Sequence, residues 1–390
     1  MLLTSVEAIG FRNLATRVDF GTGLNILWGR NAQGKTSVLE AIYALANTKS
    51  FRTSALRDAI AFGATEAIVR GSIERGGIHR ELQMRLSGSR KEFYVNGKRE
   101  SAVGYISQLD AVVFSFEELG IVRGEPAERR RFLDRGVVGL RPAYLRTIAD
   151  YNRILRQKNR LLRDASEADD FDPKRASALR STVGAWNEQL VELGAEMHRE
   201  RVAYVEKLSN ALARNLFGEQ LDVRYVSSFE GKGDLGDYEA LFRERLELRF
   251  DAEAASGHSL IGPHRDDLEV LVKGREVGRF GSAGQQRSAL LILDLAQVDV
   301  YYEAFEEYPI LLIDDIDAEL DRSRIDRLLG HVEGKAQTFI STSKQDIANS
   351  FRSRAEIFAV SAGIVEREPA DTAVDIASMD SAATGESEEI

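Results

Sequence analysis

GRNAQGKT, residues 29–36, matches the pattern G-x-x-x-x-G-K-[ST] at every fixed position. A short apolar run, residues 24–28, precedes it, and residues 36–46 follow with apolar side chains at helical spacing. In such a strand, loop and helix, backbone N–H groups converge on phosphate oxygens. The helix N-terminus adds about half a positive charge. The stretch therefore predicts a nucleotide phosphate site.

This motif predicts ATP and Mg²⁺ as the cofactors. Lys35 would reach the β and γ phosphates and contribute to catalysis, and the Thr36 hydroxyl would ligate Mg²⁺. A chance glycine turn with a surface lysine is the alternative, and the flanking strand and helix patterns disfavour it. The residues expected to contact the nucleotide here are Gly29, Arg30, Asn31, Ala32, Gln33, Gly34, Lys35 and Thr36.

Two adjacent acids end an apolar run at residues 309–313. The end of a buried strand is where a carboxylate can meet a metal held by Thr36, so we assign Asp314 to Mg²⁺. Asp315 points differently and could orient or deprotonate the attacking water. Alone, such a strand is more often structural, but the motif at residues 29–36 favours the catalytic interpretation.

GSAGQQR, residues 281–287, precedes a helical pattern and resembles the signature motif of ABC ATPases. In that family the loop caps the γ-phosphate bound by the opposite protomer, which is anion binding at a helix terminus supplied in trans. Ser282, Gly284 and Gln285 are the predicted contacts, and an ATP-dependent homodimer follows. A plain glycine-rich helix start is the alternative. Residues 317–321 resemble the D-loop, and residues 338–342 occupy the switch strand without its frequent histidine.

Composition is that of an ordinary globular protein, with 43% hydrophobic residues and no cysteine. No window reaches the roughly 20 apolar residues of a membrane span, which predicts a cytoplasmic protein without a membrane partner. The net charge of −10 argues at first against a nucleic-acid partner. However, residues 371–390 contain six acids and no base, so basic patches remain compatible with the rest of the chain.

We predict an α/β fold, an ABC-type P-loop ATPase head with an antiparallel β-subdomain and an inserted helical arm. Asn96-Gly97 marks a hairpin turn within alternating strands. Two amphipathic helical patterns joined by a polar loop form the arm. The domains are predicted as residues 1–140 for the N-terminal half of the head, 141–220 for the arm, 221–370 for the C-terminal half of the head and 371–390 for a disordered acidic tail.

More than half of the chain separates Thr36 from Ser282. That is too much for a transporter ATPase subunit, and the arm is far too short for an SMC or Rad50 coiled coil. The chain resembles the RecF family from residue 1 to about 366. The resemblance is carried by residues 11–13 (FRN), 49–53 (KSFRT), 112–115 (VVFS), 124–134 (GEPAERRRFLD), 151–159 (YNRILRQKN) and 262–268 (GPHRDDL).

The RecF resemblance implies ATP-dependent dimerisation on DNA near single-strand gaps, cooperation with RecO and RecR in loading RecA, and a role in SOS induction. The sequence departs from the family at Ala32, where a glycine is common, and at Phe116, where proline is usual. Asp315 replaces the glutamate of transporters, so we expect slow, DNA-stimulated hydrolysis in an ATP-gated clamp. An SMC- or Rad50-like structural ATPase without a gap-repair role is the alternative.

A repair clamp needs Lys and Arg that contact the phosphate backbone without reading bases. One cluster in the arm contains five basic side chains within eleven residues, and another follows the P-loop helix. A solvated helix face is the more frequent reason for such a charge run, and the resemblance raises the DNA interpretation. The predicted contacts to single-stranded and gapped duplex DNA are Lys49, Arg52, Arg153, Arg156, Lys158 and Arg160.

Overall fold

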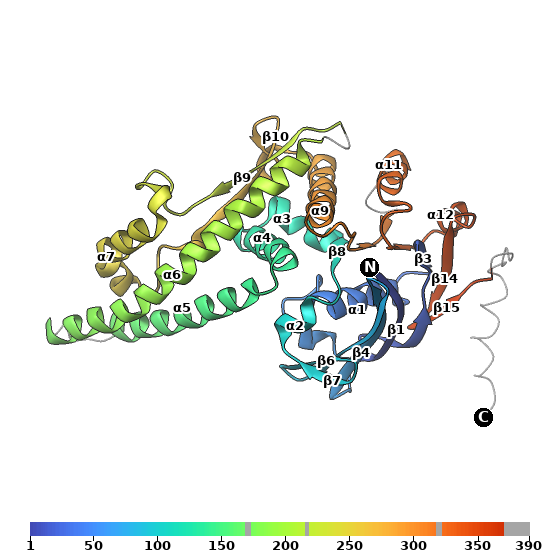
Figure 1. The fold of residues 1–390 in the computed structure, drawn as a ribbon, viewed down its shortest axis with the longest axis horizontal. Helices are drawn as coiled ribbons and strands as arrows, with labels where there is room; N and C mark the ends of the chain where they lie inside the picture. Colours follow the sequence, from blue (N-terminus) through green and yellow to red (C-terminus); the bar gives the residue numbers. More distant parts are fainter. Residues whose placement is uncertain (168–172, 215–217, 317–321, 370–390) are drawn as a thin grey trace, which may run out of the picture.

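The computed structural model describes residues 1–167, 173–214, 218–316 and 322–369. A head built on two six-stranded sheets carries a helical arm that projects from one side (Figure 1). Both predicted features, the α/β head with its antiparallel subdomain and the helical arm, are confirmed. The predicted tail, residues 371–390, and the predicted D-loop, residues 317–321, lie outside the described residues.

A mostly parallel sheet forms the centre of the head. Its central strands β12 and β13 are buried along their whole length, as parallel strands covered on both faces require. Strands β3 and β13 have the bounds expected from the sequence and pair in parallel. The sheet contains, in spatial order, β15 (Ile364–Arg367), β14 (Ala355–Ser361), β3 (Leu24–Trp28), β13 (Thr338–Thr342), β12 (Ile310–Ile313) and β8 (Ala111–Phe114).

An antiparallel sheet packs against helix α1 (Lys35–Asn47), which follows β3 directly. Burial alternates along its strands, so one face meets the core and the other meets solvent. Asn96 and Gly97 both have positive φ and form the predicted hairpin turn. In spatial order the strands are β2 (Leu14–Asp19), β1 (Leu2–Phe11), β4 (Glu66–Arg75), β5 (Ile78–Ser87), β6 (Arg90–Val95) and β7 (Lys98–Glu100).

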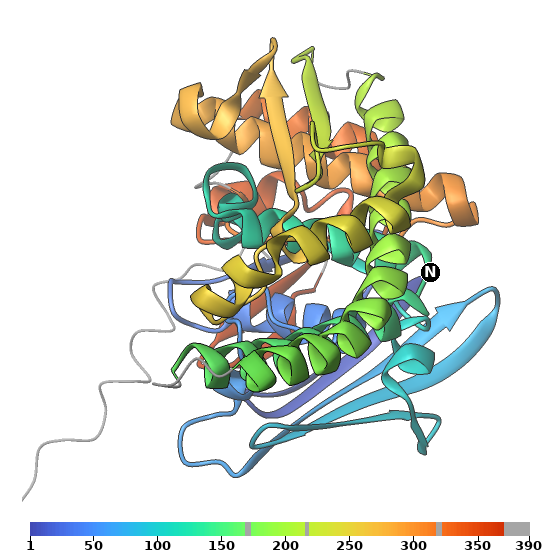
Figure 2. The ribbon, with the colours of Figure 1, turned by 90° about the vertical axis from the view of Figure 1, so that its left-hand side faces the viewer.

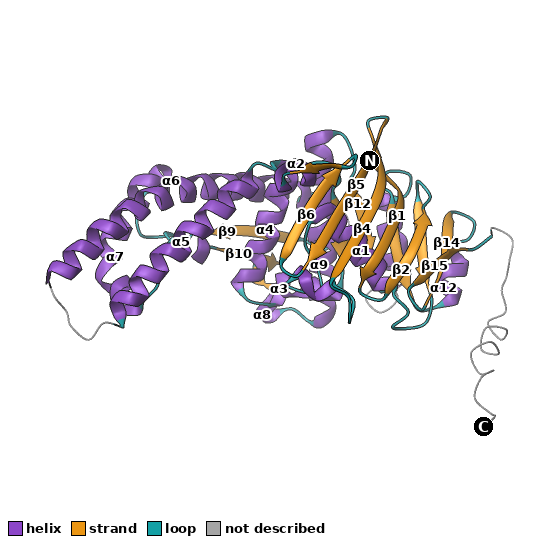
Figure 3. Cartoon of the chain, turned by 90° about the horizontal axis from the view of Figure 1, so that it is seen from below, coloured by secondary structure: helices purple, strands orange, loops and turns teal. Residues whose placement is uncertain are grey.

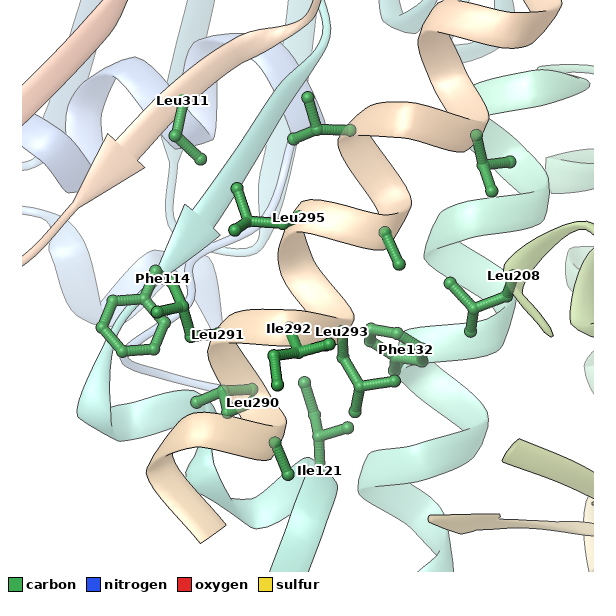
Figure 4. Packing of buried hydrophobic residues seen from close by; sticks show 14 of the residues in the cluster. Phe114, Ile121, Phe132, Leu208, Leu290, Leu291, Ile292, Leu293, Leu295 and Leu311 are labelled. Carbon is green, nitrogen blue, oxygen red and sulfur yellow. The ribbon is translucent and has the colours of Figure 1, made fainter. Parts of the chain in front are cut away.

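Helix α9 (Ala283–Phe305) runs through the core and is buried on all sides from Ser288 to Tyr301. Figure 4 shows its leucines facing both the parallel sheet, at Phe114 and Leu311, and the helices beyond, at Phe132 and Leu208. Phe132 belongs to α4 (Pro126–Leu140) and Leu208 to α6 (Pro173–Leu212). This helix therefore connects the sheet mechanically with the base of the arm.

The arm consists of α5 (Tyr144–Ser166) and α6, which run antiparallel, and of α7 (Tyr238–Ser256) packed beside them (Figures 2 and 3). Phe250 of α7 joins Leu162 and Val183 in a small core between the three helices. The predicted boundary at residue 140 falls between α4 and α5. Since α7 lies within residues 221–370, the helical arm extends beyond the predicted 141–220.

A small third sheet and several short helices complete the described chain. None of the helices in the described ranges is long and apolar enough to cross a membrane. The sheet contains β11 (Arg275–Glu276), β10 (Asp267–Val272) and β9 (Leu221–Val226). The helices are η1 (Leu56–Ala59), α2 (Ala102–Ile106), η2 (Phe116–Leu119), α3 (Gly120–Arg123), η3 (Leu235–Asp237), η4 (Pro263–Arg265), α8 (Val277–Phe280), α11 (Arg322–Val332) and α12 (Gln345–Ser350).

Candidate nucleotide site and signature loop

The loop between β3 and α1 has the backbone shape of a phosphate cradle. Gly34 (φ 117°) is the N-cap of α1 and offers no side chain to cap the helix, so the first N–H groups remain available to an anion. A Cβ at Gly29 would come within 2.3 Å of the Val360 carbonyl oxygen, so only glycine fits there. Ala32 lies in the left-handed region at φ 65°, where glycine is favoured.

The Lys35 ammonium group lies over this loop. Its Nζ donates hydrogen bonds to the carbonyl oxygens of Gly29 (2.8 Å) and Arg30 (3.0 Å), and the residue is buried. The loop therefore holds the cation at the place where phosphate oxygens would meet it. This position agrees with the sequence-based role of Lys35 in ATP binding.

Three oxygen-bearing side chains from separate elements converge beside Lys35. The Thr36 hydroxyl donates to Asp314 Oδ1 at 2.9 Å, and the Ser341 hydroxyl donates to the same oxygen at 2.7 Å. Burial raises the pKa of Asp314, and these hydrogen bonds oppose the increase. A bound cation would favour the carboxylate form, and oxygen donors of this kind suit Mg²⁺. The donor set of Thr36 and Asp314 thus fits the predicted metal site.

Asp315 begins the turn after β12 with φ 46°, a conformation that aspartate tolerates better than most residues. Its backbone N–H donates to the Ser341 hydroxyl at 2.8 Å. Ser341 therefore links both acids, because the same hydroxyl group contacts Asp314. The sequence identified the switch strand but not this role. A serine in this strand belongs to no motif that would indicate such a contact.

A buried carboxylate in α1 organises the second layer of the site. Glu40 is fully buried and accepts a two-pronged ion pair from Arg12, at 2.8 and 2.7 Å. Ser50 and Arg52 also donate to it. The FRN and KSFRT segments thus meet on the helix that follows the P-loop. Sequence reasoning missed Glu40, because a single acid in an apolar helix has no motif.

The P-loop is also supported by the last hairpin of the parallel sheet. The backbone N–H of Ala362 donates to Gln33 Oε1 at 2.7 Å, and that of Gly363 donates to the Gln33 carbonyl oxygen at 2.8 Å. Gln33 therefore shapes the loop from outside, through the turn between β14 and β15. This supporting role was not expected from the sequence, which assigned Gln33 to direct nucleotide contact.

The signature loop forms the start of α9 and lies on the surface. Ser282 and Gln285 form a capping box, in which the Gln285 N–H donates to Ser282 Oγ (3.3 Å) and the Ser282 N–H donates to Gln285 Oε1 (2.8 Å). Ser282 through Gln285 are exposed. The capping box ties Ser282 and Gln285 to their own loop, and both remain accessible to a second molecule.

Aromatic and basic side chains surround this loop. Phe116, at 46% exposure, lies 5.5 Å from the Arg123 guanidinium and 5.9 Å from that of Arg287. Phe280 is 63% exposed beside Arg279. Exposed aromatic rings with arginines are typical of protein interfaces. The sequence marked Phe116 only as a departure from the RecF pattern.

The predicted DNA contacts separate into exposed and buried residues. Arg153, Arg156 and Arg160 are exposed on α5, although Arg153 pairs with Asp150. Lys158 is wrong as a surface contact. It is fully buried, and its Nζ lies 2.6 Å from Glu253 Oε2 in α7. Helical spacing explains the difference, because residue 158 faces α7 while its neighbours face solvent.

Lys49 and Arg52 lie in the loop after α1 and are both exposed. The Arg52 guanidinium is also paired with Glu40, and its charge partly opposes the rise in the pKa of Asp314 that burial causes, so it belongs to the surroundings of the nucleotide site. Although Lys49 is exposed as a whole residue, desolvation of its ammonium group, followed by repulsion from Arg135, lowers its pKa. The structure thus places both cations in the loop that follows the P-loop helix.

The parallel sheet, the P-loop and the separate exposed signature loop together define an ABC-type ATPase head. The family model for the RecF/RecN/SMC N-terminal domain matches residues 2–366. The chain belongs to the RecF family within this class. It is 34% identical to the DNA replication and repair protein RecF of Ligilactobacillus salivarius, over 94% of this chain and 98% of the relative.

Solved structures agree with this assignment. A structure of the recombination mediator protein RecF with ATP, from the RecFOR pathway, matches 94% of this chain and 97% of its own, with a TM-score of 0.84 and 29% identity. The Smc head domain with an extended coiled coil from Pyrococcus furiosus covers 94% of this chain and 95% of its own. Its TM-score of 0.50 and 16% identity show a shared fold alone.

Proposed function

We propose that this protein is an ATP-gated clamp acting in DNA replication and recombinational gap repair. Two copies bind two ATP–Mg²⁺ between them, with the P-loop of each copy facing the signature loop of the other. DNA near a single-strand gap is held by the dimer. RecO and RecR cooperate with it in loading RecA, which links the clamp to SOS induction and places it in the cytoplasm.

The observation that carries the proposal is the geometry of the two half-sites. Thr36 and Asp314, far apart in sequence, lie 2.9 Å apart, whereas Ser282 lies exposed at the start of another element. A signature loop on the surface can serve a nucleotide only if that nucleotide is brought to it. The P-loop of a second copy supplies such a partner, and the N-terminus of α9 adds favourable partial charge for its γ-phosphate.

In this clamp the residues divide the work between binding and hydrolysis. The P-loop backbone and Lys35 bind the phosphates, and Thr36 with Asp314 would hold the metal. The metal supplies charge neutralisation on the phosphates when it is bound. Asp315 orients the attacking water or accepts its proton, supported by Ser341. An aspartate reaches less far than a glutamate, which favours slow hydrolysis and a long-lived closed state.

An SMC- or Rad50-like structural role is the alternative function. The likeness to the Smc head, at 16% identity, is limited to the fold, whereas the RecF relative is 34% identical along nearly its whole length. The arm also consists of three packed helices in place of a long coiled coil. These observations favour the gap-repair clamp. A structural ATPase would bind continuous duplex and gapped DNA equally well, whereas the clamp prefers gapped DNA in the presence of ATP.

Lys35→Ala tests the nucleotide site directly. The variant should fold normally but lose ATP binding and ATP-dependent dimerisation, because the phosphates lose their main cation. Light scattering of the purified protein with and without ATP measures the mass, and circular dichroism checks the fold. Arg90→Ala, at a 68% exposed position on β6 outside the nucleotide site, serves as the control and should retain the dimer. Normal ATP-dependent assembly of Lys35→Ala would refute the proposed site.

A further inference from the structure

Two clefts lie on either side of α4, at the junction of head and arm. One, of about 230 Å³, opens between the loop after α1 and α4, and Lys49, Arg52 and Arg131 are among its lining residues. The other, of about 370 Å³, opens between α4, α5 and α6, and Arg130, Arg131 and Asn152 are among its lining residues. Because Arg131 lines both clefts, they are neighbours across a single helix.

Most of the acids that line these clefts are already neutralised by arginines. Glu118 pairs with Arg135, and Asp134 with the buried Arg201. Glu128 pairs with Arg131 itself, whose side chain remains 54% exposed. Lys49 has no carboxylate partner in the described part of the chain, so its charge is available to a ligand.

The cleft between α4, α5 and α6 continues into a polar face of α5 that begins at Asn152. Asn152, Arg156, Arg160 and Arg163 follow one another at steps of four, four and three residues, which places them on one side of the helix. All four are exposed. They span roughly 16 Å along the helix axis, from the rise of about 1.5 Å per residue. The arginines of this face have no carboxylate partner among the described residues.

Repulsion between the arginines on this face of α5 destabilises the helix when no anion is bound. Like charges at a spacing of four residues, as in Arg156 and Arg160, destabilise a helix by about 0.2–0.5 kcal/mol. Arg153, on a neighbouring face, shows the usual solution, since Asp150 lies 2.9 Å from its guanidinium. The absence of such compensation along the other arginines, within the described part of α5 and its neighbours, is explained if an anion provides it.

We propose that Lys49, Arg131, Asn152, Arg156, Arg160 and Arg163 form one continuous track that binds the phosphate backbone of DNA, running from the head across α4 and along α5. This inference rests on the proposed DNA clamp and specifies where its partner lies. The track joins two basic clusters that are far apart in the sequence. It also replaces Lys158, which is buried, with residues of α4 and α5 that face the clefts.

The chemistry of the track fits a nucleic-acid backbone better than a small anion or a peptide. Cations spread over a head loop and two helices match a long, regularly charged chain and exceed what a single phosphate group can contact. Asn152 adds a neutral hydrogen-bond donor, which suits phosphate oxygens. These side chains lie along clefts and a helix surface, where they would contact the backbone without base readout.

The decisive variants change the middle of the track, where the proposal goes beyond the two separate clusters. Arg131→Glu reverses a charge between the clefts, and Asn152→Asp adds a negative charge at nearly constant size. Fluorescence anisotropy with gapped DNA and ATP, at several salt concentrations, gives the affinity and its salt slope. Each variant should weaken binding roughly tenfold, and Arg131→Glu should reduce the slope by about 0.9 for each duplex phosphate that the protein no longer neutralises.

Arg199→Glu is the matched control, because Arg199 is 65% exposed on α6 and lies outside both clefts. It should bind like the wild type. If both middle variants also bind like the wild type while Arg156→Glu/Arg160→Glu binds weakly, the continuous track is overturned and the clamp stands. Weakened binding in only one middle variant likewise refutes continuity. A wild-type protein that fails to bind gapped DNA refutes the clamp and the track together.

Discussion

Ala32 shows how a single residue adjusts the phosphate loop of this protein. Its φ of 65° falls in the left-handed region, in which a Cβ costs roughly 1–2 kcal/mol. The next residue, Gln33, is held by the backbone N–H groups of Ala362 and Gly363, which fixes the loop beside Ala32. The loop is therefore built in a glycine-like shape even though an alanine occupies the position.

Ala32→Gly should consequently be tolerated or slightly stabilising. Glycine removes the cost of the left-handed conformation, which stabilises the folded state. It also gives the unfolded chain more backbone entropy, which destabilises the folded state by about 0.4–1 kcal/mol. We expect the free energy of unfolding to change by less than about 1 kcal/mol in urea denaturation. Ala41→Gly, in the buried middle of α1, is the control and should destabilise by about 1 kcal/mol or more. Equal destabilisation by both variants would show that Ala32 is unstrained.

At the scale of elements, the segments that resemble RecF meet at the junction between head and arm. Arg129 of α4 forms a two-pronged ion pair with Asp267 at the start of β10. Arg201 of α6 holds Asp134 of α4 and the Pro263 carbonyl oxygen. These contacts bring the GEPAERRRFLD and GPHRDDL segments together. Several residues of these two RecF-like segments therefore stabilise the junction between the head and the arm.

His264 belongs to the same joint and predicts a pH dependence of stability. Burial lowers its pKa to about 3, and Nδ1 lies 2.8 Å from the Tyr151 hydroxyl oxygen. In the unfolded chain the His264 side chain has a pKa near 6.5 and takes up a proton below that pH, whereas in the folded protein it stays neutral. The contribution of His264 to the free energy of unfolding is therefore fully present above pH 6.5 and is lost as the pH falls toward 3. At pH 5 the loss from His264 is about 2 kcal/mol.

Urea denaturation at pH 7 and pH 5 measures this effect. His264→Gln should lose less stability over that interval than the wild type, because the variant has no proton to accept. His79→Gln is the matched control, since His79 is 76% exposed, and it should behave like the wild type. The same pH dependence in all three proteins would contradict a neutral buried His264.

Lys158 predicts a different outcome from its exposed neighbours on α5. Lys158→Ala leaves Glu253 charged and buried between α5 and α7, which should cost about 3–5 kcal/mol of unfolding free energy. Arg156→Ala, two residues earlier on the exposed face, should change stability by less than about 0.5 kcal/mol. Thermal or urea denaturation of both variants provides the comparison. A neutral effect of Lys158→Ala would contradict the buried ion pair.

At the scale of the whole molecule, the sequence predicted the head well because its signals are local. The P-loop, the apolar strands β3 and β13 and the Asn96-Gly97 turn each depend on a few neighbouring residues. Helix α7 was not separated from the C-terminal half of the head. Its place in the arm is determined by long-range packing, such as that of Phe250 on Leu162.

In the nucleotide site, the sequence predicted the residues that belong to motifs but not those that support them. The pairing of Thr36 with Asp314 follows from motifs and from the convergence of parallel strands at one edge of a sheet. Ser341, Glu40 and Gln33 support these residues through contacts that no motif encodes. The burial of Lys158 depended on whether a helix outside the predicted arm would cover that face of α5.

The molecule as a whole presents two half-sites on separate surfaces. One is the P-loop with Asp314, and the other is the exposed start of α9, flanked by Phe116 and Phe280. Neither half binds both ends of a triphosphate by itself in the proposed arrangement. The central claim is therefore that ATP joins two copies of the chain and that Ser282 acts in trans.

The mass of Ser282→Arg with ATP and Mg²⁺, measured by analytical ultracentrifugation, tests this claim most directly. The bulky cation would block the signature loop but leave the P-loop of the same chain intact. We predict that the variant still binds ATP through its own P-loop, but more weakly than the wild type because the contact in trans is lost. It should retain the fold and sediment as the 43.4 kDa monomer, while the wild type becomes a dimer. A Ser282→Arg protein that dimerises with ATP as the wild type does would contradict the account.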